Sequence, residues 1–158
     1  MNAEELATVA TLIRSQRVAA LGTLRGDGPF VSMVAYAAEP DFSGLLLHLS
    51  WLAAHTKQLV AAPQSSLLIC ERDDGRDDVQ TLARITLAGV ATPIPAESAA
   101  FADARACYLA RLPAAMQLFD FPDFTLFRFI PSEARYIGGF ARAYTLTPEQ
   151  LHCATERL

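Results

Sequence analysis

The sequence predicts a mainly β domain, an antiparallel β-barrel that carries accessory helices. Several short apolar runs are joined mostly by tight turns, which is typical of all-β barrels and sandwiches. The early runs also follow one another too closely for the crossover helices that parallel strands need. A chain of 158 residues has the size of one domain. We therefore expect a single antiparallel barrel rather than a doubly wound sheet.

The first part of the chain predicts a helix followed by a β-hairpin. Asn2 and Glu5 have the spacing of a capping box, and apolar residues follow them at helical spacing. Apolar and β-branched residues then dominate segments 18–24 and 30–37, and the turn-forming segment 25–29 separates them. We expect a short amphipathic helix and two antiparallel strands.

The middle of the chain predicts three further strands and a second helix. Segments 45–49 and 66–71 are apolar runs, and segment 52–62 between them has helical character and ends before a proline. Segment 83–92 alternates as a strand, and Gly89 is the expected site of a β-bulge.

The last part of the chain predicts one more helix and two strands. Apolar residues keep helical spacing over 101–112, and Pro113 ends the helix. Segment 124–130 alternates as a strand, and segment 135–137 is expected to form another. A turn at 138–140 is expected to precede a polar tail.

Composition and charge restrict the class of protein. Apolar residues make up 52% and charged residues 19% of the chain, an apolar excess that oligomerisation would hide. The net charge of -4 argues against a general nucleic-acid surface. No apolar run approaches the roughly 18 residues of a membrane span, and no signal peptide is recognisable, so we expect a cytoplasmic protein with no membrane partner.

No metal site or disulfide framework is expected. The three cysteines, Cys70, Cys107 and Cys153, are odd in number and widely separated. His48 lies within an apolar strand, where a hydrogen-bonded structural histidine is the favoured interpretation. Neither a glycine-rich dinucleotide fingerprint nor a nucleophile motif of a hydrolase is present.

The most informative stretch is the junction between the strand at 45–49 and the helix that follows it. Ser50, His55, Thr56 and Lys57 bring hydroxyls, an imidazole and an ammonium group to the beginning of a helix, where free amides favour anions. This arrangement predicts a phosphate-binding site. The alternative is an ordinary N-capped helix with Lys57 in water.

Three segments in this order resemble one family. They are LSWLAAHTKQLVAAPQSSLLI, TLARITLAGVATPI and DFPDFTLFRFIPSEARYIGGFAR. Together they resemble the pyridoxamine 5'-phosphate oxidase-like FMN-binding split barrels, and in particular the branch of HugZ-like haem-utilisation proteins. The resemblance implies a six-stranded antiparallel split β-barrel over the single domain 1–158, with its core at about 18–142. It also implies a homodimer that binds FMN in clefts at the interface.

The resemblance also implies cofactor-binding residues. The FMN phosphate would be held at 50–57, and the ring system would lie beside Ser32 and Val34. Arg84 would bring a polar side chain toward the cofactor. The Arg-Lys pair of the true oxidases is replaced by Ala54 and His55, and no substrate-binding signature follows residue 140.

The predicted function is therefore a flavin-dependent oxidoreductase that acts on an unidentified small molecule. Three alternatives stay open. One is a HugZ-like protein that binds or degrades haem, the second is a noncatalytic flavin-binding module, and the third is a dimeric scaffold that has lost its ligand. No catalytic residue can be assigned, because the flavin itself would supply the redox chemistry.

Overall fold

The computed structural model describes residues 1–139 and 142–156. Within these residues, four helices, two 3-10 helices and eight strands follow one another. In order they are α1 (Ala3–Ser15), β1 (Val18–Arg25), β2 (Gly28–Ala35), β3 (Ala37–Ala38), β4 (Leu45–Ser50), α2 (Ala54–Ala61), β5 (Gln64–Cys70), η1 (Val79–Thr81), β6 (Arg84–Pro93), α3 (Ala99–Arg111), η2 (Pro113–Asp120), β7 (Phe124–Ile137), β8 (Ala143–Leu146) and α4 (Pro148–Thr155).

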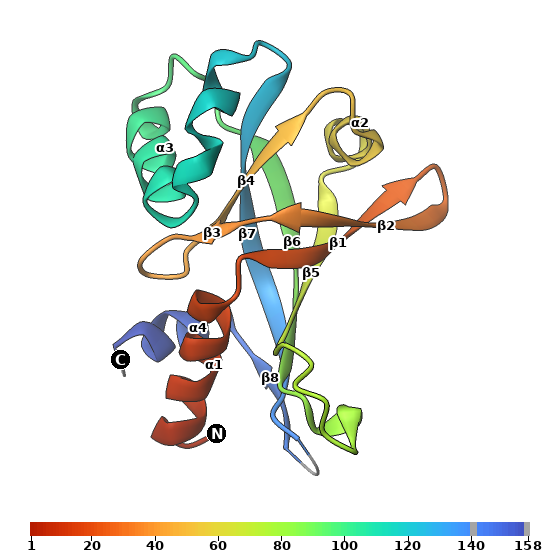
Figure 1. Ribbon diagram of the computed structural model, residues 1–158, viewed down its shortest axis with the longest axis vertical. Helices are drawn as coiled ribbons and strands as arrows, with labels where there is room; N and C mark the ends of the chain where they lie inside the picture. The colour runs from red at the N-terminus through yellow and green to blue at the C-terminus, as the bar shows by residue number, and fades with distance from the viewer. Residues whose placement is uncertain (140–141, 157–158) are drawn as a thin grey trace.

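All strands belong to one antiparallel sheet with the order β2-β1-β5-β6-β7-β4-β3, and β8 adds to β7. The first and last strands of this order, β2 and β3, are consecutive in the chain and are separated only by Tyr36. The sheet must therefore curl back on itself, as Figure 1 shows. This confirms the predicted split barrel: six long strands form it, and β3 and β8 are short additions.

The inner face of the curled sheet forms the main hydrophobic core. Side chains alternate along each strand, so that Leu21, Leu47, Leu67, Ile85 and Phe127 are fully buried. Helices α1 and α4 pack against each other at one end of the sheet, and α2 lies at the opposite end (Figure 1). The capping box predicted for α1 is present.

The bulge predicted at Gly89 is also confirmed. Gly89 pairs with Pro131 but Ala88 pairs with Glu133, so Ser132 is the extra residue in β7. A Cβ atom at Gly89 would overlap the carbonyl oxygen of Ile130, which explains the glycine. Because the bulge accommodates Pro131, which has no N–H to donate, the two strands predicted at 124–130 and 135–137 form one continuous strand.

The C-terminal part differs from the prediction. The expected polar tail contains β8 and α4, and α4 begins with a capping box between Thr147 and Gln150 and with Pro148 in its first turn. These signals are visible in the sequence but lie in a mostly polar segment. Phe140, part of the predicted turn, lies outside the described residues.

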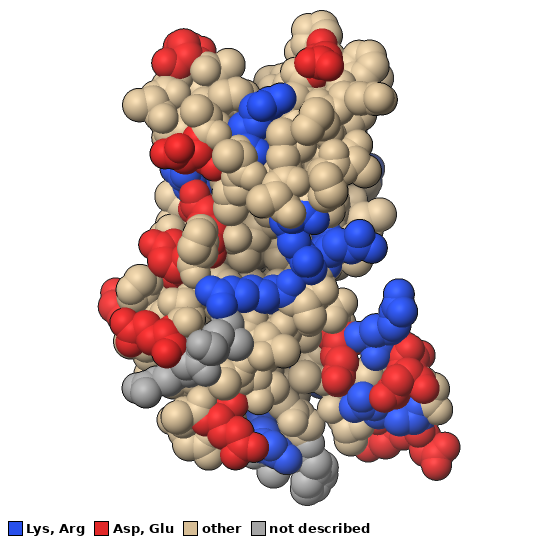
Figure 2. Space-filling view, turned by 60° about the vertical axis from the view of Figure 1, so that its left-hand side comes forward, with Lys and Arg blue, Asp and Glu red and all other residues tan. Residues whose placement is uncertain are grey.

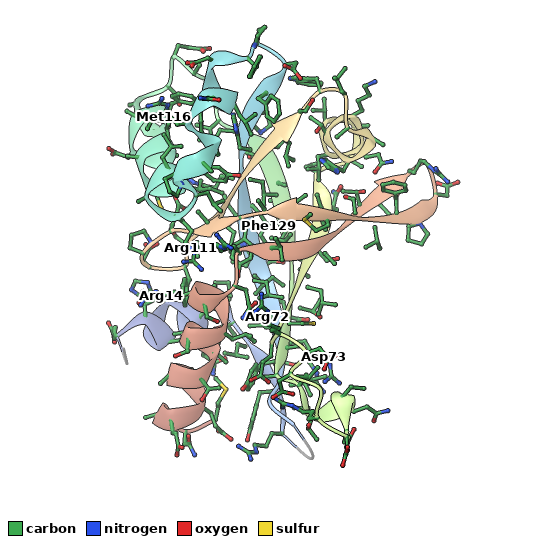
Figure 3. The ribbon with its side chains drawn as sticks, in the orientation of Figure 1. Arg14, Arg72, Asp73, Arg111, Met116 and Phe129 are labelled. Carbon is green, nitrogen blue, oxygen red and sulfur yellow. The ribbon has the colours of Figure 1, made fainter. Side chains whose placement is uncertain are left out.

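A smaller hydrophobic cluster lies between the sheet and the segment formed by α3 and η2. It contains Leu46, Leu126, Ala104 and Tyr108 among its buried residues. Arg111, at the end of α3, donates hydrogen bonds to the carbonyl oxygens of Ser15 and Gln16, at 2.9 and 3.0 Å. This contact ties α3 to the end of α1 (Figure 3).

Charges of both signs are distributed over the surface. Figure 2 shows Lys and Arg side chains in the middle of one face, with Asp and Glu side chains around them. Among the described residues, no helix has the length and apolar character required to cross a bilayer.

Candidate functional site

The junction between β4 and α2, residues 50–57, is called here the α2 start. Thr56 donates a hydrogen bond to the carbonyl oxygen of Ser50 at 2.6 Å and is fully buried. The Ser50 hydroxyl donates to Asp123 at 2.9 Å and accepts from the Leu52 amide at 3.1 Å. Both hydroxyls predicted to bind phosphate therefore donate their protons within the protein, where they fix the turn.

The structure brings His55 together with Ser32, which lies 23 residues earlier, on β2. Nδ1 of His55 and Oγ of Ser32 are 2.9 Å apart, and both side chains are half-buried. Burial lowers the pKa of the His55 imidazole below its ordinary value, because the charged form loses hydration. A neutral ring at neutral pH follows.

The first turn of α2 remains open to an anion. The residue before the helix is Ala53, so no side chain caps the first amides of α2. Lys57 is exposed, and its ammonium group makes no ion pair with any residue that the structure describes. These amides and Lys57 are the groups at the α2 start that can stabilise a phosphate or a carboxylate.

Large apolar side chains lie exposed around this site. Leu52 is 86% exposed and Trp51 is 38% exposed, although the Trp51 indole N–H donates to Thr125 at 2.9 Å. On β2, Val31 and Met33 are 66% and 70% exposed, but because side chains alternate along a strand they point to the face of the sheet opposite Ser32. Exposed apolar surface of this kind indicates a binding surface for a flat apolar molecule or a protein.

Two predicted cofactor residues lie away from the α2 start. Val34 is 3% exposed and belongs to the barrel core, so its side chain does not line a cleft of this chain. Arg84 pairs with Cys70, at the end of β5 farthest from α2. Its guanidinium donates to the carbonyl oxygens of Gln80 and Leu82, at 2.9 and 3.0 Å. FMN binding by these residues stays a prediction.

No pattern in the sequence pointed to the residues that hold α2 in place. Thr23 on β1 donates a hydrogen bond to Gln58 on α2 at 2.6 Å, and both side chains are buried. The backbone of Asp123 accepts from the Trp51 amide at 2.7 Å. These partners are far apart in the sequence and meet only because the sheet curls.

The interpretation of His48 as a hydrogen-bonded histidine needs correction. Its Nδ1 atom is buried without a hydrogen-bond partner among the described residues. The ring instead stacks on Phe119, with centroids 3.8 Å apart, and contacts Tyr108 edge-on. Burial lowers the pKa of His48 to about 4. Its role is structural, as predicted, but it acts through aromatic packing.

No group of three or more His, Cys, Asp or Glu side chains that could hold a metal ion occurs within residues 1–139 and 142–156.

A groove of about 370 Å³ lies where the β1–β2 hairpin separates from the beginning of β5, and it is lined by Thr23, Phe30 and Ser66 among others. Its lining comes from β1, β2 and β5 and includes no residue of the α2 start.

Comparison with known proteins identifies the family. The sequence profile of the CREG beta-barrel family matches residues 1–152. The chain belongs to the CREG beta-barrel family. The chloroplastic heme oxygenase HOZ of Arabidopsis thaliana is 40% identical to it over 116 residues, which cover 73% of this chain and 34% of HOZ. The chain thus spans about a third of the length of this family relative.

Solved structures agree with this assignment. The heme binding protein of Mycobacterium smegmatis has a TM-score of 0.84 and 30% identity, over 97% of this chain and 61% of that chain. A Clostridium acetobutylicum protein related to general stress protein 26, of the pyridoxinephosphate oxidase family, has a TM-score of 0.73. Its identity is 16%, over 96% of this chain and 99% of that chain, which shows the fold alone. The predicted split-barrel fold is confirmed.

Proposed function

We propose that this chain binds haem at the α2 start. The observation that carries the proposal is the half-buried His55 imidazole, held by Ser32 beside an uncapped helix and exposed apolar side chains. This combination offers an iron ligand, donors for anionic groups and apolar contact area, which are the three needs of a haem. Two relatives at 30% identity or more are named as a heme oxygenase and a heme binding protein.

The residues present fit this cofactor. The amides of the first turn of α2 and the Lys57 ammonium would bind the propionates. Trp51 and Leu52 would contact the apolar ring. When bound, haem supplies iron that can bind oxygen. The protein residues would hold and orient the ring.

Titration with ferric haem tests the proposal. We expect a saturable shift of the Soret band at a fixed ratio of haem to chain. Lys57→Ala should weaken binding by about 1 to 3 kcal/mol, the scale of a charge-assisted hydrogen bond. The matched control is Arg76→Ala, which removes a charge from the loop between β5 and η1. Absence of saturable binding by the unmodified chain would refute the proposal.

FMN is the second candidate ligand, and the uncapped amides of α2 favour it because a phosphate dianion needs several donors. Titration of flavin fluorescence separates the two ligands. Saturable quenching by FMN that haem does not reverse would favour the flavin. An FMN complex that also consumes a reductant would support the predicted oxidoreductase.

We also propose that the chain forms a homodimer through the outer face of the sheet. The register places Met33 opposite Ala20, and Ala20 opposite Leu68, on that face. Seven of its large apolar residues are exposed: Val18, Leu24, Val31, Met33, Leu68, Val90 and Ile130. Single apolar residues scattered over a surface are normal, but seven on one face form an apolar surface that favours association. A second copy of the same face would cover it.

A further inference from the structure

The three histidines of the chain differ in what surrounds their ring nitrogens. His48 is stacked against Phe119 and has no space for a ligand on that side of its ring. His152 lies exposed on α4, at the other end of the sheet from α2, with its Nδ1 3.1 Å from the carbonyl oxygen of Asp41 (Figure 1). Of the three, only His55 lies at the α2 start, together with the exposed side chains of Trp51 and Leu52.

The contact with Ser32 determines which nitrogen of His55 is available. When Nδ1 carries the proton, it donates to Ser32 Oγ at 2.9 Å and Nε2 keeps its lone pair. Ser32 Oγ makes no other hydrogen bond within the part of the chain that the structure describes. Metal-bound histidines regularly donate their second ring N–H to such an acceptor, which fixes the tautomer and the ring orientation.

We propose that Nε2 of His55 would bind the haem iron and that Ser32 is the residue that orients the imidazole. This inference rests on the proposed haem binding. The backbone supports it, because both partners belong to regular elements: His55 is in the first turn of α2 and Ser32 is in the middle of β2. The buried pair of Thr23 and Gln58 joins α2 to β1, the neighbour of β2.

Spectroscopy of the haem complex tests the ligand. His55→Ala should lose the spectrum of a histidine-ligated haem, and its affinity for haem should fall about 10- to 100-fold or more, the range seen when a metal site loses part of its support. Added imidazole should restore the spectrum, because it can occupy the space that the side chain leaves. The matched control is His152→Ala, which should keep the spectrum and affinity of the unmodified chain.

Ser32→Ala tests the orienting role separately. We expect ferrous haem still to bind, but with a lower iron–histidine stretching frequency in resonance Raman spectra, because the Nδ1–H group no longer donates to an acceptor and the imidazole becomes a weaker ligand. Ser32→Thr keeps the hydroxyl and should restore the frequency. Circular dichroism confirms that each variant is folded before the spectra are compared.

The outcomes separate this inference from the proposed function. If the unmodified chain shows no saturable Soret shift, the proposed haem binding itself is wrong. If it binds haem and His55→Ala leaves the spectrum unchanged, haem binding stands and the ligand assignment is wrong. A changed spectrum in His152→Ala alone would place the iron at α4. An unchanged stretching frequency in Ser32→Ala would overturn the role of Ser32.

Discussion

At the scale of single residues, His48 shows how a histidine can be accommodated without a hydrogen bond. Its ring packs in parallel on Phe119, and its Nδ1 atom is buried. The neutral ring packs well there, whereas a charged ring would lose hydration without gaining a partner. This difference lowers the pKa of His48 from 6.5 to about 4.

The lowered pKa predicts an acid-sensitive contribution to stability. Above pH 6.5 the ring is neutral in both the folded and the unfolded chain, so its titration does not change the free energy of unfolding. Between pH 6.5 and about 4 the unfolded chain takes up the proton first, and the free energy of unfolding falls. We expect a loss of about 1 to 3 kcal/mol, reduced by the partial exposure of the ring.

His48→Phe should keep the stacking and remove this titration. Urea unfolding at pH 7 and at pH 4.5 measures the effect. The variant should be at least as stable as the unmodified chain at pH 7 and should lose less stability at pH 4.5. Equal losses in both proteins would show that His48 does not titrate in this range.

The sequence identified several residues of the α2 start but not how they act. Helix-start chemistry pointed to Ser50, His55, Thr56 and Lys57, and all four lie at one junction. The roles of Ser50 and Thr56 depend on their acceptors, Asp123 and the Ser50 carbonyl. A pattern of residue types cannot show whether a hydroxyl proton is already donated inside the protein.

At the scale of elements, helix α2 depends on a buried polar pair. Thr23 and Gln58 are 3% and 8% exposed, and a hydrogen bond of 2.6 Å joins them. When a buried polar group loses its only partner, the protein is destabilised by the full desolvation penalty of that group. This penalty is larger than the net stabilisation that the hydrogen bond contributes.

Thr23→Val should therefore lower the free energy of unfolding by about 1 to 3 kcal/mol, since it leaves the Gln58 amide oxygen buried without a donor. Replacing both residues, with Thr23→Val and Gln58→Leu, should recover part of that loss. Urea unfolding measures both effects. Thr92→Val, at an exposed strand position, is the control and should change little. Equal effects of the two Thr→Val variants would contradict the role of the pair.

Strands and helices with regular periodicity could be predicted well, and those that depend on distant contacts could not. The bulge at Gly89 was predictable because a glycine interrupts an alternating strand. Helix α4 carried a capping box but little apolar periodicity, and contact with α1 stabilises it. Its existence depends on tertiary packing more than on local preference.

At the scale of the whole molecule, part of the apolar excess of the sequence is found on the outer face of the sheet. Met33 and Val31 project from β2, and Leu68 lies on the same face of β5. The composition predicted that an excess had to be hidden, but only the strand register shows which face carries it.

Met33→Glu should shift the proposed dimer toward monomers, because it would bury a carboxylate in an apolar interface. Light scattering during size-exclusion chromatography measures the mass. The control is Val79→Glu on η1, a residue that is 54% exposed outside this face. A monomeric unmodified chain, or a dimer that Met33→Glu leaves intact, would contradict an interface at this face.

The central claim, that haem binds at the α2 start, is tested most directly by amide NMR spectra of the labelled chain with and without gallium protoporphyrin IX, a diamagnetic haem analogue. We expect the largest shift changes at residues 50–57 and around Ser32, with no change around His152 on α4. Saturation without changes at the α2 start, or changes confined to another part of the chain, would contradict this claim.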